Sequence, residues 1–365
     1  MIPPSNPANP TTTRLAPSPT GALHLGNVRT FVVNYVLARQ RGWRVLLRVE
    51  DLDGPRVKPQ AADALIEELA WLGLEWDGPV VVQSRRQEAY RRALEQLKAA
   101  GHAYPCVCTR RDIEAAASAP HAGEHDLAYP GTCRPRFDDA RDAGILPALC
   151  APLTQAPEDV KPASPRRGQD ARETRGRDAL DTRGQDVRVT PDRPTAWRLR
   201  VDATPIVVRD HFAGEHTFDL ARICGDFVIV KNDGTAAYQL AVTLDDAESG
   251  VDAVVRGDDL LDSAARQTHL RTLLGLEQNV HYWHLPLVIG PDGRRLAKRH
   301  GDTRLAHYRA RGCPREKILG LMGFWTGQFP TRQPCSMNDL VKIFNITTMP
   351  RTQTVFSAED DAFLG

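Results

Sequence analysis

The segment Arg14–Asn27 constrains the fold of this chain more than any other stretch, and it reads Arg-Leu-Ala-Pro-Ser-Pro-Thr-Gly-Ala-Leu-His-Leu-Gly-Asn. Its two prolines restrict the backbone and Gly21 permits a tight turn, so it predicts a stiff connection between a strand and a helix. Apolar residues at helical spacing between Asn27 and Gln40 place the helix directly after it. The free N–H groups that begin such a helix form a site suited to phosphate.

His24 and Gly26 lie at the start of this helix. The His24 ring could donate a hydrogen bond to a phosphate, and Gly26 lets the backbone approach a ligand closely. An ordinary proline-rich turn with a capping histidine is the alternative interpretation, and the order of all fourteen residues argues against it.

Strand-like and helix-like segments alternate in the first third of the chain. The apolar run Arg44–Val49 suits a buried parallel strand, and Ala62–Leu72 repeats the helical period. A capping box that begins at Ser84 predicts the start of a further helix. This alternation predicts an α/β fold with a parallel, doubly wound sheet.

The second half of the chain contains three further strand signals. Ala196–Val201 predicts a strand, and 227–231 with 237–242 predicts a hairpin around Asn232-Asp233-Gly234. His284–Ile289 predicts another strand, and Gly290-Pro-Asp-Gly predicts the turn that follows it.

Charge and composition restrict the class of protein. The 365 residues carry 47 Lys+Arg and 46 Asp+Glu, a net charge of +1, which excludes a uniformly basic nucleic-acid coat but allows a local basic face. No apolar run approaches the roughly 18 residues of a membrane span. Residues 1–13 lack the pattern of a secretory signal and are expected to form a disordered lead-in.

Residues 167–190 form three imperfect octads that start at Arg167, Arg175 and Arg183. Repeats that build a solenoid need a buried apolar face, and these have almost no apolar residues. We therefore expect a disordered surface insertion over about 147–194.

Seven cysteines include the pair Cys106-Val107-Cys108. An odd count in a long chain without a signal peptide indicates reduced thiols, with a metal site as one option, and argues against a disulfide scaffold.

Together, these motifs resemble those of class I aminoacyl-tRNA synthetases, in their glutamyl branch. Arg14–Asn27 is similar to the HIGH signature, and Arg295–Arg299 is similar to the KMSKS loop. Between them, matching segments follow in the family's order, namely Arg48–Asp53, Ala237–Ala241 and Val255–Asp259. The resemblance runs from about Arg14 to His300, apart from the octads.

The resemblance implies a Rossmann-type catalytic domain in two halves, 14–104 and 201–290. Between them it implies a connective insertion, 105–200, that carries a zinc site. Residues 291–365 would hold the KMSKS-like loop and a short C-terminal segment. The 67 residues after Lys298 are too few for the anticodon-binding part of a full glutamyl-tRNA synthetase, which favours the family's shortened glutamyl paralogues.

The resemblance also implies the substrate sites. L-glutamate would be bound by Arg14, Ala16, Ser18, Glu50, Tyr238 and Arg256. Two arginines for two carboxylates and one acid for one ammonium form a chemically consistent set. ATP, accompanied by Mg²⁺, would be bound by His24, Gly26, Asn27, Arg295 and Lys298, with His24 and Lys298 as catalytic residues.

The resemblance further implies that a zinc ion is bound by Cys106, Cys108, Tyr129 and Cys133, because their spacing matches the zinc site of the shortened paralogues. Three thiolates suit a closed structural zinc site, whereas a phenolate is a less usual ligand. His121 or His125 could replace Tyr129, and three buried thiols without a metal remain an alternative.

In the shortened paralogues, the activated glutamate passes to queuosine at the wobble position (34) of tRNA(Asp). The alternatives are a trimmed glutamyl-tRNA synthetase that charges tRNA(Glu), and a non-catalytic nucleotide- or RNA-binding paralogue. Asn27, Arg295 and Ala297 depart from the family signatures and put the rate in question more than the reaction. By analogy we expect a cytoplasmic monomer.

Overall fold

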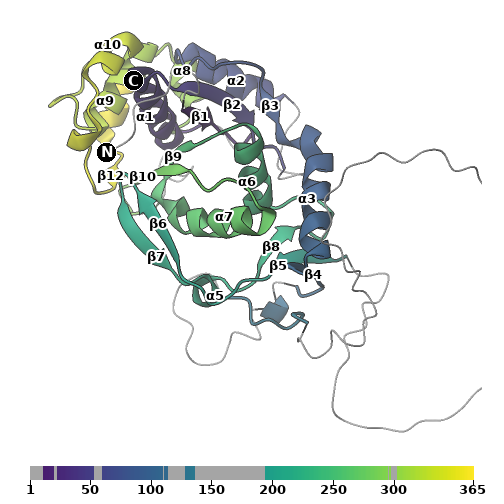
Figure 1. Cartoon of the computed structure of the whole chain (residues 1–365). Coiled ribbons are helices and arrows are strands. Elements are labelled where there is room, and N and C mark those ends of the chain that lie inside the picture. Colours follow the sequence, from purple (N-terminus) through teal and green to yellow (C-terminus); the bar gives the residue numbers. More distant parts are fainter. Residues whose placement is uncertain are drawn as a thin grey trace, which may run out of the picture. The chain divides into compact units, whose positions relative to one another are not determined.

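The computed structural model of the chain describes residues 11–19, 23–52, 60–109, 111–113, 128–135, 194–294, 296 and 302–365. These residues form a central seven-stranded sheet, two smaller sheets and the helices that surround them (Figure 1). The octads 167–190 lie outside the described residues, as do all residues of the KMSKS-like loop 295–299 except Leu296.

The central sheet has the strand order β3-β2-β1-β9-β10-β6-β7. Its strands are β1 (Thr12–Leu15), β2 (Arg44–Val49), β3 (Val81–Val82), β6 (Ile206–Asp210), β7 (Gly214–Phe218), β9 (Ala253–Gly257) and β10 (His281–Leu285). Every neighbouring pair is parallel except β6 and β7, which form an antiparallel hairpin at one edge. The predicted α/β architecture is confirmed, and the predicted parallel sheet is parallel apart from the pair β6 and β7.

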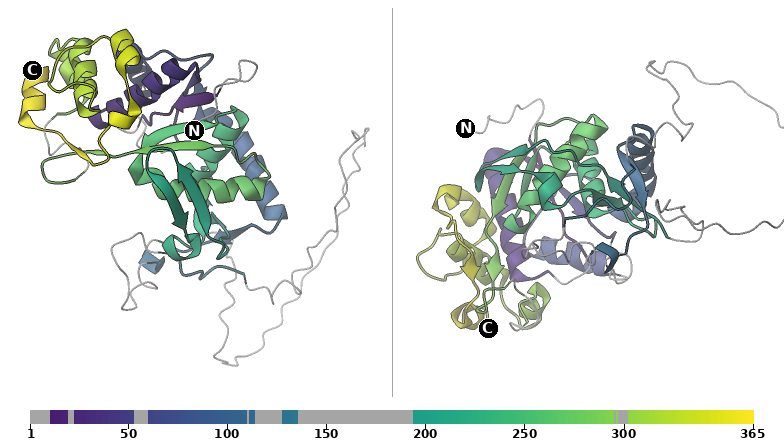
Figure 2. Two further views of the ribbon diagram at one scale, coloured as in Figure 1. Left: turned by 60° about the vertical axis from the view of Figure 1, so that its left-hand side comes forward. Right: turned by 90° about the horizontal axis from the view of Figure 1, so that it is seen from below.

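Helices cover both faces of this sheet (Figures 1 and 2). The apolar core on one face, the first core, includes side chains of α1 (Leu25–Arg41), α2 (Ala61–Trp71), α8 (Leu305–Ala310), α9 (Arg315–Trp325), α10 (Met337–Ile343) and α11 (Ala358–Leu364). The core on the other face, the second core, includes side chains of α3 (Gln87–Ala99), α6 (Tyr238–Glu248) and α7 (Leu261–Leu274). Neighbouring residues point to opposite faces, so Val255 joins the first core and Val254 the second.

A three-stranded antiparallel sheet contains β4 (Ala103–Cys106), β5 (Ala196–Leu199) and β8 (Phe227–Val230). Cys106 pairs with Ala196, so the chain leaves this sheet and returns to it at adjacent positions. The third sheet pairs β11 (Val288–Ile289) with β12 (Thr354–Val355). Short helices are α5 (Leu220–Ile223), η2 (Gln83–Arg86), η4 (Asp258–Leu260) and η6 (Ile346–Thr348).

The predicted hairpin around Asn232-Asp233-Gly234 is wrong in its second arm. The turn forms, with the Gly234 N–H donating to the Lys231 carbonyl, but only a single bridge follows it and α6 begins at Tyr238. Leu240, Ala241 and Leu244 lie on the buried side of α6, and a short apolar run does not distinguish a helix from a strand.

Two further expectations near chain turns differ from the structure. Ser84 lies within η2, α3 starts after Arg86 without a side-chain cap, and the Ser84 N–H donates to Asp51. β1 begins at Thr12, inside the stretch 1–13 that was expected to be a disordered lead-in, and both Thr12 and Thr13 are buried. No described helix is long and apolar enough to cross a membrane.

The C-terminal helices belong to the first core, because Leu305, Ile318, Leu340 and Leu364 are buried in it. Gly320 is a close contact point, since a Cβ there would lie 1.7 Å from the Gln333 carbonyl oxygen.

We expect Gly320→Ala to lower the free energy of unfolding by roughly 1–3 kcal/mol, because α9 must move away from the backbone at Gln333. Urea denaturation measures the change. Lys342→Ala, at a side chain that is 73% exposed, is the control and should change stability by less than about 0.5 kcal/mol. Equal effects of the two substitutions would contradict the close contact.

Candidate active site

The central sheet reverses its direction of winding between β1 and β9. From β1 the chain passes through α1 to β2 on one side, and from β9 it passes through α7 to β10 on the other. Ligands of open α/β sheets bind in the crevice beyond the carboxyl ends of the strands at such a point.

A cavity of about 450 Å³ lies at this position. It brings together every predicted substrate residue within the described part of the chain, namely Arg14, Ala16, Ser18, His24, Gly26, Asn27, Glu50, Tyr238 and Arg256. Arg295 and Lys298 lie outside the described residues. Residues from four separate stretches of the sequence therefore line one space.

The pleat of the strands explains why three arginines gather on one face. Arg14, Arg48 and Arg256 lie near the carboxyl ends of β1, β2 and β9. Each side chain bonds to a residue of α6 or α7, the helices on the second face of the sheet. A shift of one residue in any of these strands would direct its arginine into the apolar core on the other face.

Asp246 of α6 connects two of these arginines. Its Oδ1 lies 3.2 Å from Arg14 Nε and 2.5 Å from Arg48 Nη1, and all three side chains are almost completely buried. Burial alone would raise the pKa of the Asp246 carboxyl, but Arg48 and Arg14 outweigh burial and lower that pKa below its usual value. Asp246 is therefore an anion that fixes both guanidinium groups.

Glu50 lies at the end of β2 and accepts a hydrogen bond from Arg48 Nη2 at 3.0 Å. Burial raises the pKa of Glu50 above its usual value, although Arg48 and Arg14 oppose this shift. Ionisation of Glu50 therefore opposes folding, and a positively charged ligand in the cavity would favour the ionised form.

Asp245, next to Asp246, ties α6 to η2 and α3. It accepts hydrogen bonds from Gln83 at 2.8 Å, from Arg86 Nε at 2.6 Å and from the Tyr90 hydroxyl at 2.9 Å. Asp245 also lies 4.0 Å from Arg48 Nε, so the two adjacent carboxylates share Arg48 but differ in their other partners.

The start of α1 forms another wall of the cavity. His24 is the N-terminal cap residue, and the Leu25 N–H donates to the Thr303 carbonyl at 3.0 Å. The Leu305 N–H donates to the Leu23 carbonyl at 2.7 Å, so the segment that follows residues 297–301 is bonded to the start of α1. A Cβ at Gly26 would lie 3.4 Å from His24 Nδ1, so Gly26 leaves room beside this ring.

Arg256 and Tyr238 face the cavity from the β9 side. Arg256 is 5% exposed and donates to His284 Nε2, to Gln267 Oε1 and to the Leu260 carbonyl. Tyr238 is 37% exposed, so its ring is accessible to a ligand in the cavity.

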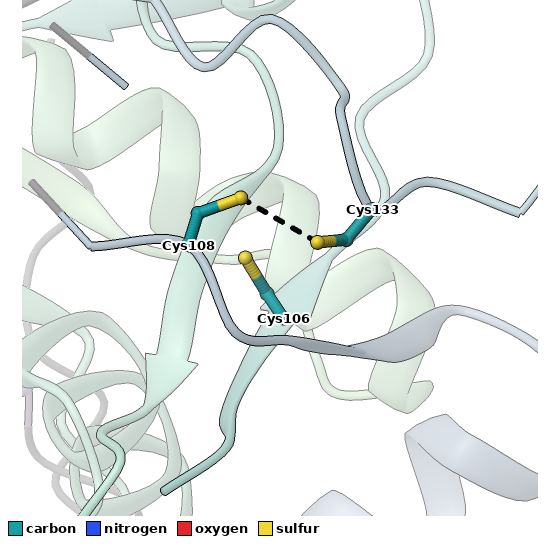
Figure 3. Close-up of side chains that lie close together, drawn as sticks. All are labelled: Cys106, Cys108 and Cys133. Carbon is teal, nitrogen blue, oxygen red and sulfur yellow. Dashed lines mark hydrogen bonds between the residues drawn. The ribbon is translucent and has the colours of Figure 1, made fainter. Parts of the chain in front are cut away.

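A second group of predicted residues lies at the end of β4, in the three-stranded sheet. The sulfur atoms of Cys106, Cys108 and Cys133 lie within 4.8 Å of one another, and the Cys108 and Cys133 sulfurs are 3.5 Å apart (Figure 3). The Tyr129 hydroxyl lies 3.5 Å from Cys106 Sγ and 3.6 Å from Cys108 Sγ. His121 and His125 lie outside the described residues.

These separations fit a tetrahedral zinc ion. Bonds of about 2.3 Å to sulfur and 2.0 Å to oxygen would place ligand atoms roughly 3.5–3.8 Å apart. Arg198 Nε lies 3.2 Å from Cys106 Sγ, and the guanidinium lies 3.7 Å from the Tyr129 ring centroid. Burial opposes ionisation of Cys106, but hydrogen bonds from Tyr129 and the backbone, together with Arg198, lower the pKa of its thiol overall.

Sequence reasoning did not assign roles to Arg48, Asp245, Asp246 or His284. The sequence signal that could have identified the charged ones among them is a charged residue within or next to an otherwise apolar segment. Arg48 interrupts the apolar run of β2, and Asp245-Asp246 follows Leu244 on α6, beyond the stretch 237–242 predicted to be a strand.

Comparison with known proteins agrees with this geometry. The family model for the catalytic domain of class I tRNA synthetases (E and Q) matches residues 10–144 and 156–360. A glutamyl-Q tRNA(Asp) synthetase of Rhodopirellula baltica is 44% identical over 84% of this chain and 82% of its own. One from Symbiobacterium thermophilum is 39% identical over 96% of this chain and 97% of its own.

This chain belongs to the glutamyl-Q tRNA(Asp) synthetase family. A solved structure of a glutamate tRNA ligase from Elizabethkingia meningosepticum has the same fold, with a TM-score of 0.70 at 23% identity. That comparison covers 97% of this chain and 68% of the ligase. The expected class I synthetase fold is therefore confirmed, and the chain is a ligase of the aminoacyl-tRNA synthetase class.

We expect Glu50→Gln to stabilise this family member while reducing its activity. The pKa of Glu50 is higher in the folded protein than in the unfolded chain, where it is about 4.3. The free energy of unfolding therefore decreases as pH rises from the unfolded-state pKa through the folded-state pKa. At pH 7 the substitution removes the unfavourable free energy of keeping an ionisable carboxyl group buried. Thermal unfolding should therefore occur at a higher temperature, and glutamate-dependent ATP–pyrophosphate exchange should fall by about tenfold or more.

The control is Glu359→Gln, at a side chain that is 80% exposed. The stability difference between the Glu50 variant and the unsubstituted protein should shrink as pH decreases towards 4, and a constant difference would contradict burial as its cause.

Proposed function

We propose that this chain activates L-glutamate with ATP in the absence of tRNA and transfers it to queuosine at the wobble position of tRNA(Asp). The observation that carries the proposal is the cavity between β1 and β9. It combines two arginines and one buried acid with the start of α1, in a chain whose relatives are named glutamyl-Q tRNA(Asp) synthetases.

Glutamate would bind through charge. Arg14 and Arg256 would each pair with a carboxylate, and Glu50 would accept hydrogen bonds from the ammonium, with Ala16, Ser18 and Tyr238 enclosing the substrate. Each charge-assisted hydrogen bond contributes about 1.5–3 kcal/mol. The neutral amide of glutamine would leave one guanidinium poorly paired, so this set favours glutamate.

ATP, with Mg²⁺, would lie against the start of α1. The free N–H groups at Gly26 and Asn27 and the ring of His24 would contact its phosphates, with Arg295 and Lys298 on the opposite side. The α-carboxylate of glutamate attacks the α-phosphorus, which forms glutamyl-adenylate and releases pyrophosphate. Positioning and charge stabilisation account for catalysis of such a step.

Cys106, Cys108, Tyr129 and Cys133 would hold one structural zinc ion. The distances between their ligand atoms support this assignment, and Arg198 would offset part of the negative charge of three thiolates and a phenolate. When bound, the ion would cross-link the end of β4 to the segment around Tyr129.

The acceptor is inferred from the relatives, which are named glutamyl-Q tRNA(Asp) synthetases. A conventional glutamyl-tRNA synthetase would charge tRNA(Glu), and a non-catalytic paralogue would show no exchange with any amino acid. We assign the reaction to the cytoplasm, where ATP and tRNA are available. We also propose that the protein acts as a monomer.

Pyrophosphate exchange and tRNA labelling test this proposal. We expect ATP–pyrophosphate exchange with glutamate in the absence of tRNA, and transfer of labelled glutamate only to tRNA(Asp) that contains queuosine. tRNA(Asp) without queuosine and unmodified tRNA(Glu) are the controls. Charging of tRNA(Glu) at its 3′ end would refute the proposal in favour of a conventional synthetase.

Metal analysis tests the zinc assignment. The purified protein should contain one equivalent of zinc, which Cys133→Ser should remove, whereas Tyr129→Phe should weaken zinc binding by about 10–100-fold because three thiolates remain. Cys313→Ser, at a buried cysteine of the first core, is the control and should retain the metal. Full retention of zinc by the Cys133 variant would exclude this site.

A further inference from the structure

His284 lies behind the cavity, on β10, and its side chain is completely buried. Its Nδ1 lies 2.7 Å from Asp210 Oδ2, and its Nε2 lies 2.9 Å from Arg256 Nε. Asp210, at the end of β6, is also buried. A hydrogen-bonded chain thus runs from β6 through β10 to the arginine that lines the cavity.

The direction of these bonds fixes the tautomer of His284. An arginine can only donate, so His284 Nε2 must be the unprotonated acceptor, and the proton resides on Nδ1 and is donated to Asp210. Burial lowers the pKa of His284, although Asp210 opposes this shift, so the ring is neutral near pH 7. A proton on Nε2 would face the N–H of Arg256 and break the bond.

Asp210 has no freedom to reorient. Its Oδ1 accepts hydrogen bonds from the backbone N–H groups of Phe212 at 2.8 Å and Ala213 at 2.6 Å. Its Oδ2 also accepts from the His284 backbone N–H at 3.0 Å. The carboxylate therefore presents a fixed acceptor to the histidine ring.

The remaining bonds of Arg256 hold it from two other sides. Nη1 donates to Gln267 Oε1 at 3.0 Å, and Nη2 donates to the Leu260 carbonyl at 3.1 Å. Gln267 is itself oriented, because its Nε2 donates to Gln239 Oε1 at 3.2 Å. Three of the five N–H groups of Arg256 are thus used, and within the described residues no acceptor reaches the other two.

We infer that His284, backed by Asp210, is a positioning residue that holds Arg256 in the orientation in which its two remaining N–H groups bind a substrate carboxylate. The inference rests on the proposed function, because it takes Arg256 as part of the glutamate site. Simple packing does not account for the arrangement. An aromatic residue of similar size would stack on the Tyr282 ring equally well but would leave Arg256 Nε without an acceptor.

Two amide substitutions separate the two functions of the ring. His284→Gln places an acceptor near the position of Nε2, which preserves the bond from Arg256 and loses the one to Asp210. His284→Asn places an amide near Nδ1, which preserves the bond to Asp210 and leaves Arg256 Nε unpaired.

We expect His284→Asn to raise the KM for glutamate about tenfold or more in ATP–pyrophosphate exchange, with the KM for ATP unchanged. His284→Gln should remain close to the unsubstituted protein. Thermal unfolding of each variant checks that it folds.

Asp210→Asn provides an independent test that leaves the histidine in place. The new amide favours the opposite tautomer, with the proton on Nε2 facing Arg256, so the KM for glutamate should rise as it does in His284→Asn. Equal glutamate KM values in the two histidine variants, or an unchanged KM in Asp210→Asn, would overturn the positioning role. Absence of any glutamate-dependent exchange by the unsubstituted chain would instead refute the proposed function, and the inference with it.

Discussion

The carboxylate of Asp246 is the central partner of the buried charged side chains beside the cavity. It lies between Arg14 and Arg48, and Arg48 in turn bonds to Glu50. Removing the Asp246 carboxylate would cost about 3–5 kcal/mol, because it would leave the buried guanidinium groups of Arg14 and Arg48 without the anion they share. Three residues at or near strand ends, Arg14, Arg48 and Glu50, therefore depend directly or through Arg48 on one carboxylate of α6.

The same ion pairs that join α6 to the sheet therefore also position charged groups at the cavity. The parallel strands bring their carboxyl ends to one edge, and the pleat directs Arg14, Arg48 and Arg256 to the same face. Each guanidinium is then held by a partner that is itself bonded elsewhere, as Asp210 holds His284 and Gln239 holds Gln267. Such a framework orients charges before a ligand arrives, which reduces the entropy lost on binding.

The amino-acid sequence predicted much of this architecture. Proline and glycine in Arg14–Asn27 and the strongly periodic segments fixed the parallel sheet and α1, because these signals are local. The prediction of a hairpin after Phe227 was wrong because its second arm belongs to α6. Packing against α7 stabilises this helix, and such packing is not a local property of the sequence. Substrate residues were assigned through resemblance, and their supporting partners, Asp246 and His284, were missed because long-range hydrogen bonds leave no spacing pattern in the sequence.

The pairing of Cys106 with Ala196 has a consequence for how chains of this kind can diverge. The 89 residues between them start and end at two adjacent points on neighbouring antiparallel strands. Because the entropic cost of closing a loop increases only slowly with its length, residues can be gained or lost between Cys133, the last of the proposed zinc ligands, and Ala196 with little loss of stability. Insertions and deletions are therefore expected to accumulate here during evolution, while the spacing of the catalytic segments on either side stays constant.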